Sequence, residues 1–214
     1  MQWTRLIGQG TWMLENDPEQ RAVEALRLGV ELGMTLIDTA EMYGHGRAEE
    51  IVGRAIAGRR EGLFIVSKVL PSNASYDGTR RACERSLRRL GIDCLDLYLL
   101  HWPGSHPIAE TVRGLESLVR DGMTERIGVS NFDVEELRAA RRASRNVPLA
   151  CNQVLYHLGD RGIERRLIPY CRENGVTVMG YSPFGHGDFP EPSSQGGRVL
   201  ADVAARHGKT PRQV

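Results

Sequence analysis

Residues 95–101 read LDLYLLH, a short apolar run that ends on a histidine, and this pattern recurs along the chain. Residues 35–38 (TLID) end on Asp38, and residues 63–68 (LFIVSK) end on Lys68. Apolar runs of this kind, rich in branched residues, predict strands that are covered on both faces. Amphipathic segments separate the runs, so the sequence predicts an α/β protein of alternating strands and helices.

Helix start and stop signals support this alternation. Asp133 and Glu136 have the spacing of a capping box, and Gly91 lies just past a predicted helix end. The predicted strands are 35–38, 63–68, 95–101, 126–130, 150–153 and 177–181. The predicted helices are 18–32, 48–57, 77–90, 108–121, 133–142 and 163–174, with a last helix from about Arg198. Repeated units of roughly 30–35 residues fit a (β/α)8 barrel or a doubly wound sheet.

Composition narrows the class of protein. The chain has 214 residues, 41% of them hydrophobic, which is enough for one sizeable core. Basic and acidic residues number 28 and 27, so the net charge of +1 gives no argument for nucleic acid or a membrane as a partner. The N-terminal segment lacks an apolar signal core, and no run approaches the ~18 apolar residues of a membrane span. Four widely spaced cysteines without metal-ligand spacing predict a cytoplasmic protein with reduced thiols and no metal site.

One predicted helix carries a run of basic residues. No aromatic or glycine pattern for nucleic-acid binding accompanies it, so we expect these side chains to form a solvated outer helix face. The run consists of Arg80, Arg81, Arg85, Arg88 and Arg89.

Four polar residues at or just after three of the predicted strands suggest a reaction. Asp38, Lys68 and His101 end their strands, and Tyr43 follows Asp38 by one short loop. Ligands of parallel α/β proteins bind beyond the carboxyl ends of the strands, so the four side chains are expected to converge. Each one alone is more often structural. Together, a carboxylate, a phenol, an ammonium and an imidazole can carry out acid catalysis on a carbonyl.

The chemistry of these groups assigns them expected roles. A tyrosine has an ordinary pKa of ~10, too high for an efficient acid at neutral pH. We expect Lys68 to lower the pKa of Tyr43, and Asp38 to keep Lys68 charged and aimed. His101 would donate a hydrogen bond that orients the substrate carbonyl.

The usual nucleotide-binding signatures are absent. Gly8-Gln9-Gly10 and Gly44-His45-Gly46 each lack the third glycine of a GxGxxG fingerprint, and no GxxxxGK[ST] loop is present. Any nucleotide must therefore be held in another way.

Longer motifs resemble the aldo-keto reductase family and occur in family order along nearly the whole chain. They are GQGTW, LIDTAEMYG, GRAEEIVGRAI, VSKVLP, SLRRLGIDCLDLYLLHWPG, IGVSNF, CNQVLYH and GYSPFG. The segments GQGTW, VLYHLGDRGIE and YSPFG most resemble sequences of the bacterial branch that contains methylglyoxal and 2,5-diketogluconate reductases. The resemblance implies a monomeric (β/α)8 TIM barrel that binds NADPH in extended form, without a Rossmann domain, and reduces small carbonyl compounds.

The resemblance also implies site residues. Asp38, Tyr43, Lys68 and His101 match the family's catalytic tetrad, and Trp12 and Trp102 match the walls of the substrate pocket, which Tyr43 and His101 also line. The positions that match the cofactor site are Gly10, Thr11, Asp38, Ser130, Asn131, Gln153, Tyr181, Ser182, Pro183 and Phe184. Of these, Ser130, Asn131 and Gln153 match the family's nicotinamide-carboxamide contacts, and Tyr181 matches the residue against the nicotinamide ring. Asn131 and Gln153 could instead satisfy loop backbone, and the tryptophans could simply pack.

The resemblance predicts a single barrel domain over residues 1–214 that lacks C-terminal strands and helices, because about six β/α units are counted where a closed barrel has eight. Residues 35–38 and 177–181 would then be open edges, at which self-association is an option. Two functional interpretations stay open. The chain is an NADPH-dependent carbonyl reductase with Tyr43 as general acid, or it is a non-catalytic, truncated reductase scaffold that acts in binding or association.

Overall fold

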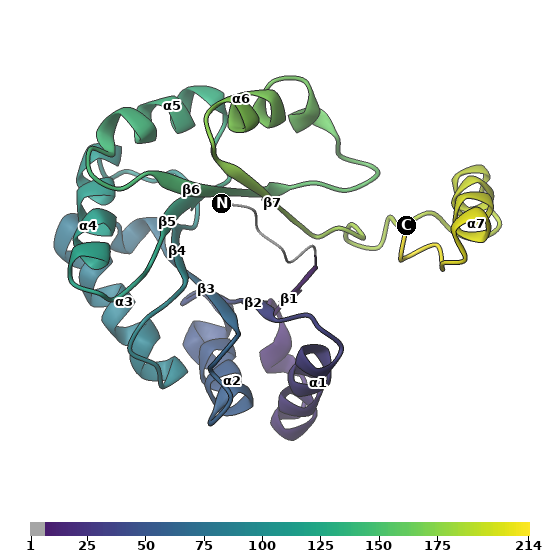
Figure 1. Ribbon diagram of the computed structural model, residues 1–214, viewed down its shortest axis with the longest axis horizontal. Helices are drawn as coiled ribbons and strands as arrows, with labels where there is room; N and C mark the ends of the chain where they lie inside the picture. Colours follow the sequence, from purple (N-terminus) through teal and green to yellow (C-terminus); the bar gives the residue numbers. More distant parts are fainter. Residues whose placement is uncertain (1–6) are drawn as a thin grey trace.

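The computed structural model describes residues 7–214 and contains one sheet of seven parallel strands that curves around a central axis, with helices outside it (Figure 1). Each strand pairs with the next one along the chain. The strands are β1 (Gly8–Gly10), β2 (Leu36–Asp38), β3 (Phe64–Val69), β4 (Leu97–Leu100), β5 (Ile127–Ser130), β6 (Leu149–Leu155) and β7 (Thr177–Tyr181).

Seven α-helices connect or follow the strands of the described chain. They are α1 (Glu19–Glu31), α2 (Arg47–Ile56), α3 (Tyr76–Leu90), α4 (Ile108–Arg120), α5 (Val134–Ala143), α6 (Leu167–Glu173) and α7 (Gln195–His207). The capping box predicted at the start of α5 is present, since Asp133 accepts from the Glu136 backbone and Glu136 accepts from the Asp133 backbone. Short 3-10 turns lie at Leu14–Asn16, Tyr43–Gly46, Pro71–Asn73 and Gly162–Glu164.

The topology confirms the predicted barrel type, because parallel strands in sequential order with outer helices are the arrangement of a (β/α)8 barrel. The sheet is nearly closed: in the described part of the chain, β1 and β7 do not pair with each other.

The predicted count of six strands is wrong, because Gly8–Gly10 forms β1 and covers the edge of β2 that the sequence left open. Three residues with two glycines give no periodic apolar signal. The first glycine has a structural cause, since a Cβ on Gly8 would lie 2.5 Å from a methyl carbon of Leu36.

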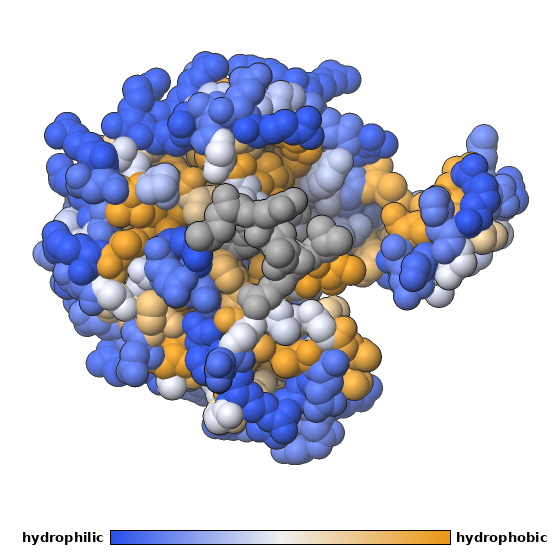
Figure 2. Space-filling model, in the orientation of Figure 1, coloured by the Kyte–Doolittle hydropathy of each residue, from blue (hydrophilic) through white to orange (hydrophobic). Residues whose placement is uncertain are grey.

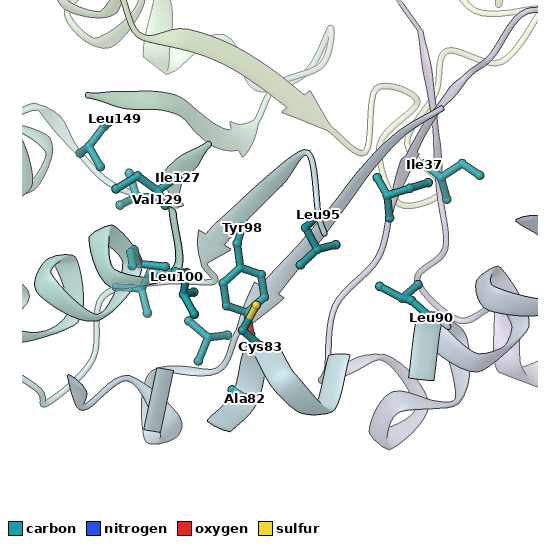
Figure 3. Packing of buried hydrophobic residues seen from close by; sticks show 14 of the residues in the cluster. Ile37, Ala82, Cys83, Leu90, Leu95, Tyr98, Leu100, Ile127, Val129 and Leu149 are labelled. Carbon is teal, nitrogen blue, oxygen red and sulfur yellow. The ribbon is translucent and has the colours of Figure 1, made fainter. Parts of the chain in front are cut away.

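The core has two layers that follow the alternation of side chains along each strand. Tyr98 and Leu100 of β4 point outward into the layer between sheet and helices, where Tyr98 packs beside Ala82 and Cys83 of α3 (Figure 3). The inner layer fills the barrel and consists of Leu36, Val66, Leu97, Leu99 and Cys151. Each fully buried aliphatic side chain of this kind stabilises the fold by about 1.5–3 kcal/mol.

Helix α7 differs from the other helices in position. Figure 1 shows it beyond the end of β7, apart from the ring of helices around the sheet. Figure 2 shows hydrophobic surface on this helix and on the neighbouring part of the barrel, and Val199 of α7 is 56% exposed. None of the helices within residues 7–214 has the length and apolar character needed to cross a membrane.

The contact between α2 and α3 provides a test of the packing. A Cβ on Gly53 of α2 would lie 2.7 Å from the Arg89 carbonyl oxygen and 2.8 Å from that of Leu90. We predict that Gly53→Ala lowers the free energy of unfolding by about 1–2 kcal/mol, because the two helix backbones must separate. Gly162→Ala is the control, since its Cβ would meet nothing closer than 3.8 Å. Urea denaturation of both variants measures the difference, and equal stabilities would contradict the predicted contact.

Candidate active site

The inner layer of the barrel gives way to polar side chains two residues further along β2, β3 and β6, and just past the end of β4. Leu36 is followed by Asp38, Val66 by Lys68, Leu99 by His101 and Cys151 by Gln153. Side chains two apart on a strand point to the same face. The carboxyl end of the barrel is therefore lined by charged and polar groups, whereas its interior below is apolar.

Lys68 is the centre of this polar group. It lies in β3 opposite Leu99 of β4, and its side chain is fully buried. Its Nζ lies 2.6 Å from Asp38 Oδ2, 2.9 Å from the Thr39 carbonyl oxygen and 3.2 Å from Tyr43 Oη. All three ammonium donors thus have acceptors, which is the condition under which a buried charge is tolerated.

Tyr43 reaches Lys68 through an unusual turn. The three residues that follow it, Gly44, His45 and Gly46, all have left-handed backbone angles, with φ of 54°, 52° and 94°. Glycine adopts this conformation without steric cost, whereas His45 is strained by it. Tyr43, whose ring lies over the Lys68 ammonium, begins this turn, and α2 starts directly after it.

His101 adjoins the phenol on its other side. Its ring lies 5.7 Å from that of Tyr43, edge-on, and 4.7 Å from that of Trp102. The imidazole is buried, and its Nδ1 has no hydrogen-bond partner among the described residues. The structure therefore brings all four predicted tetrad side chains together and sets Trp102 beside them.

The electrostatics of the tetrad leave Lys68 charged and His101 neutral. Burial lowers the pKa of Lys68, but Asp38 and Tyr43 outweigh it, so the net pKa is raised and the ammonium stays charged. Burial, with a contribution from Lys68, lowers the pKa of His101 to about 3. The imidazole is therefore neutral at physiological pH and can donate a hydrogen bond from one ring nitrogen.

Lys68 lowers the pKa of Tyr43, as expected, but the net pKa of the phenol is nevertheless raised. Burial of the phenol raises its pKa, and Asp38 adds to the rise, while Lys68 lowers it. Desolvation is the largest of these effects, so the net pKa lies above the ordinary value. The sequence could indicate the neighbouring ammonium but not how deeply the phenol is buried.

The ends of β5, β6 and β7 connect to the tetrad through hydrogen bonds. Tyr181 Oη donates to Asn131 Oδ1 over 2.9 Å, and Asn131 Nδ2 donates to the His101 carbonyl over 3.1 Å. Ser130 Oγ donates to the Gln153 carbonyl over 2.8 Å, and Gln153 Nε2 donates to Asp38 Oδ1 over 2.7 Å. Both oxygens of Asp38 are thus occupied, one by Gln153 and the other by Lys68. The alternative in which these amides satisfy loop backbone is also partly realised, through the Asn131 bond to His101.

The end of β1 supports Asp38 from its backbone. Gly10 pairs with Asp38 in the sheet, and the backbone N and the Oγ1 of Thr11 each donate to the Asp38 carbonyl over 3.0 Å. The side chain of Thr11 is fully buried. Gly10 and Thr11 therefore both fix the backbone of Asp38, Gly10 through strand pairing and Thr11 through two hydrogen bonds.

The remaining predicted site residues lie in two loops. Trp12 follows β1, and Ser182, Pro183 and Phe184 follow β7. Ser182 has a left-handed φ of 49° and hydrogen-bonds to His186, and the exposed Pro183 leads to Phe184. Phe184 is 42% exposed and packs against Phe189 and Arg212 rather than against the tetrad. Trp12 packs its ring at 5.5 Å from His186, so the β1 and β7 loops touch across the gap in the barrel.

Several residues around the tetrad were not identified from the sequence. The Thr39 carbonyl accepts from Lys68, and Glu41 and Glu49 are buried carboxylates on either side of Tyr43. The sequence did contain a sign that Glu49 is buried. It shares a helix face with the apolar Val52 and Ile56, where a solvated glutamate is not expected.

The prediction that the basic run of α3 forms a solvated outer face is wrong for two of its arginines. Arg85 pairs with buried Glu41, and Arg89 pairs with buried Glu49 and is only 20% exposed. No group of histidine, cysteine, aspartate and glutamate side chains suited to a metal ion is found within residues 7–214.

Comparisons with known proteins agree with this geometry. A sequence profile of the Aldo/keto reductase family matches residues 6–214. The chain belongs to the aldo/keto reductase family. The chain is 47% identical over 210 residues to the methylglyoxal reductase YeaE of Escherichia coli. The match covers 97% of this chain and 74% of that relative. The chain is 37% identical over 211 residues to the glyoxal reductase of Bacillus subtilis, with 97% and 72% covered.

A solved aldo/keto reductase structure resembles the fold closely. The crystal structure of an aldo/keto reductase from Klebsiella pneumoniae in complex with NADP and acetate superposes with a TM-score of 0.85 at 44% identity. The match covers 96% of this chain and 74% of that one.

The side chains at the ends of β5 to β7 fit the nicotinamide cofactor of an aldo/keto reductase. A nicotinamide offers a flat ring and a carboxamide. Tyr181 presents an aromatic ring, and Ser130, Asn131 and Gln153 present hydroxyl and amide groups from adjacent strands. Gln153 uses its Nε2 on Asp38, while its Oε1 makes no hydrogen bond to the described residues and can accept one. The donor and acceptor set thus matches the group in kind.

Burial of His101 predicts a pH-dependent loss of stability in this aldo/keto reductase. Its folded-state pKa of about 3 lies below the ordinary value of ~6.5, so the unfolded chain binds a proton first as the pH falls. Stability is therefore lost between about pH 6.5 and pH 3, and this residue alone accounts for about 2 kcal/mol by about pH 5.

Replacement of His101 tests this account. We predict that His101→Gln loses about 2 kcal/mol less than the parent between about pH 8 and pH 5, measured by urea denaturation at each pH. His207→Gln, at an exposed site on α7, is the control and should behave like the parent. An identical pH dependence in the parent and His101→Gln would show that the imidazole titrates normally in the folded state.

Proposed function

We propose that this aldo/keto reductase reduces aldehydes or ketones to alcohols, with NADPH as the hydride donor and Tyr43 as the general acid. The observation that carries the proposal is the 3.2 Å contact between Tyr43 Oη and the fully buried Lys68 Nζ, itself 2.6 Å from Asp38. A charged lysine, buried and aimed at a phenol, is arranged to assist the release of the phenolic proton.

The tetrad residues divide the work of carbonyl reduction. Tyr43 Oη donates its proton to the substrate oxygen as negative charge develops there, and the Lys68 ammonium stabilises the resulting phenolate. The neutral His101 donates a second hydrogen bond to the same oxygen and fixes the direction of the carbonyl. Asp38 keeps Lys68 protonated and oriented, which accounts for the raised Lys68 pKa.

The cofactor site in this proposal lies at the ends of β5, β6 and β7. NADPH, when bound, supplies the hydride that reduces the carbonyl carbon. Ser130, Asn131 and Gln153 would hold its carboxamide, and Tyr181 would cover its ring. Asn131 and Ser182 have left-handed backbones, a strain that is common where the backbone approaches a ligand.

Backbone groups beyond these strands complete the proposed cofactor contacts. Gly10 and Thr11 would contribute from β1, and Ser182, Pro183 and Phe184 from the loop after β7. In this loop the Phe184 ring is exposed, and the guanidinium of Arg212, which follows α7, lies 5.1 Å from it.

The substrate in this proposal is a small carbonyl compound, such as a 2-oxoaldehyde. The relatives named methylglyoxal reductase and glyoxal reductase support this choice. Trp12 and Trp102 are 52% and 36% exposed at the mouth of the barrel, where indole rings would form an apolar, tolerant pocket around a small substrate.

The non-catalytic alternative is not favoured. A scaffold that acts only in binding has no need for a buried ammonium with three acceptors, which costs desolvation energy and adds little net stability. We also infer a cytoplasmic location, supported by four free cysteines, three of them buried. Cell fractionation with an antibody against the chain tests that location.

Removal of the phenol tests the assigned acid. We predict that Tyr43→Phe lowers kcat for methylglyoxal reduction by about 10²–10⁴-fold, because the proton donor is lost while the ring remains. The dissociation constant for NADPH, followed by quenching of tryptophan fluorescence, should stay within about threefold of the parent, since none of the proposed cofactor contacts is removed. Turnover of Tyr43→Phe at the parental rate would exclude Tyr43 as the acid.

A further inference from the structure

A buried carboxylate lies behind the tetrad, on the outer side of the sheet. Glu49 of α2 is fully buried, and its Oε1 accepts from Ser67 Oγ over 2.5 Å. Its Oε2 accepts from the guanidinium of Arg89 over 2.6 Å. Ser67 directly precedes Lys68, so this carboxylate joins the helix after Tyr43 to the strand that carries the ammonium.

A second buried carboxylate, Glu41, precedes Tyr43 in the sequence, whereas Glu49 follows it. Glu41 Oε1 accepts from the Leu70 backbone N over 2.8 Å and from Asn73 Nδ2 over 2.9 Å. Its Oε2 accepts from Arg85 over 3.3 Å. The Glu41 backbone N also donates to the Lys68 carbonyl over 3.4 Å. The second carboxylate thus joins the segment before Tyr43 to the end of β3.

The two carboxylates have the same three connections. Each lies on the segment that carries Tyr43, each bonds to a residue of β3 or just after it within two positions of Lys68, and each pairs with an arginine of α3. Arg85 and Arg89 are four residues apart, so both lie on one face of α3, which packs against α2 beside β3 (Figure 1). Glu41 and Glu49 thus flank Tyr43 in one segment, while Ser67 and Leu70 flank Lys68 in the other.

Stability alone gives little reason for this arrangement. A buried carboxylate costs desolvation energy that its attraction to a partly exposed arginine scarcely recovers. In some proteins buried charges of this kind are retained because they fix a unique geometry. The turn after Tyr43 needs one, since its left-handed backbone is strained at His45 and the Arg89 guanidinium lies against Gly46, where an added Cβ would come within 2.6 Å of it.

We propose that Glu41 and Glu49, through Arg85 and Arg89, are positioning residues that hold the Tyr43 hydroxyl at its 3.2 Å distance from the Lys68 ammonium. The inference rests on the proposed function, because the distance matters only if Tyr43 is the acid. It assigns a role in catalysis to side chains on the outer side of the sheet.

A double-mutant cycle separates positioning from general structural support. Glu41→Gln keeps the size of the side chain and removes its charge, while Arg85 can turn to solvent. We expect this change to lower kcat about tenfold in the parent and less than about twofold in the Tyr43→Phe background, where no acid remains to be positioned. The dissociation constant for NADPH should be unchanged in both backgrounds.

Arg80 provides the matched control on the same helix. It pairs with Asp121 over 2.5 Å and donates to Ser117 over 2.8 Å, on the side of α4 and away from Tyr43. Arg80→Gln therefore removes an α3 ion pair, and should lower the melting temperature while leaving kcat within about twofold of the parent. If Glu41→Gln does not fold, Arg85→Lys enters the same cycle, since it keeps the charge but loses the planar fork.

The outcomes are distinct. Loss of kcat in the parent background only, with Arg80→Gln unaffected, supports positioning through Tyr43. An equal loss of kcat in both backgrounds, or a loss in Arg80→Gln of the same size, overturns it and leaves a purely structural role. Failure of the proposed function itself would be recognised separately, since Tyr43→Phe alone would then retain parental turnover.

Discussion

The ion pair between Lys68 and Asp38 is the interaction on which the site depends. A fully buried ammonium is tolerated only when its protons have acceptors, and here a carboxylate, a backbone carbonyl and a phenol provide them. Those acceptors come from β2 and from the turn that follows it. The requirement of one charge therefore fixes how β2, β3 and the Tyr43 turn lie relative to one another.

The barrel supplies the other half of this constraint. An apolar interior ends one layer below the tetrad, so the polar groups face an environment in which electrostatic interactions are strong. The same burial that keeps His101 neutral raises the pKa of Tyr43 against the influence of Lys68. Desolvation thus favours the protonated phenol, the form that a proton donor needs, and the ammonium is placed to stabilise the phenolate once the proton has left.

Much of this could be predicted from sequence because the pattern is local. Apolar strands that end on Asp38, Lys68 and His101 fix which side chains converge, since residues two apart share a face. What escaped prediction depends on three-dimensional surroundings. Strand β1 is too short and glycine-rich to show a period, and Arg85 and Arg89 read as surface charges until Glu41 and Glu49 are seen buried beside them. The net direction of the Tyr43 pKa depends on burial depth, which no motif records.

On the proposed function, NADPH supplies a hydride to a small carbonyl compound while Tyr43, assisted by the buried Lys68 ammonium, protonates the carbonyl oxygen. A single-turnover experiment tests this mechanism most directly: the protein in excess over NADPH is mixed with methylglyoxal, and the loss of the reduced nicotinamide absorbance is followed with analysis of the product. We expect one alcohol to form for each NADPH oxidised, at a rate that falls sharply in Tyr43→Phe. Bound NADPH that stays reduced in the presence of methylglyoxal and other small aldehydes and ketones would contradict it.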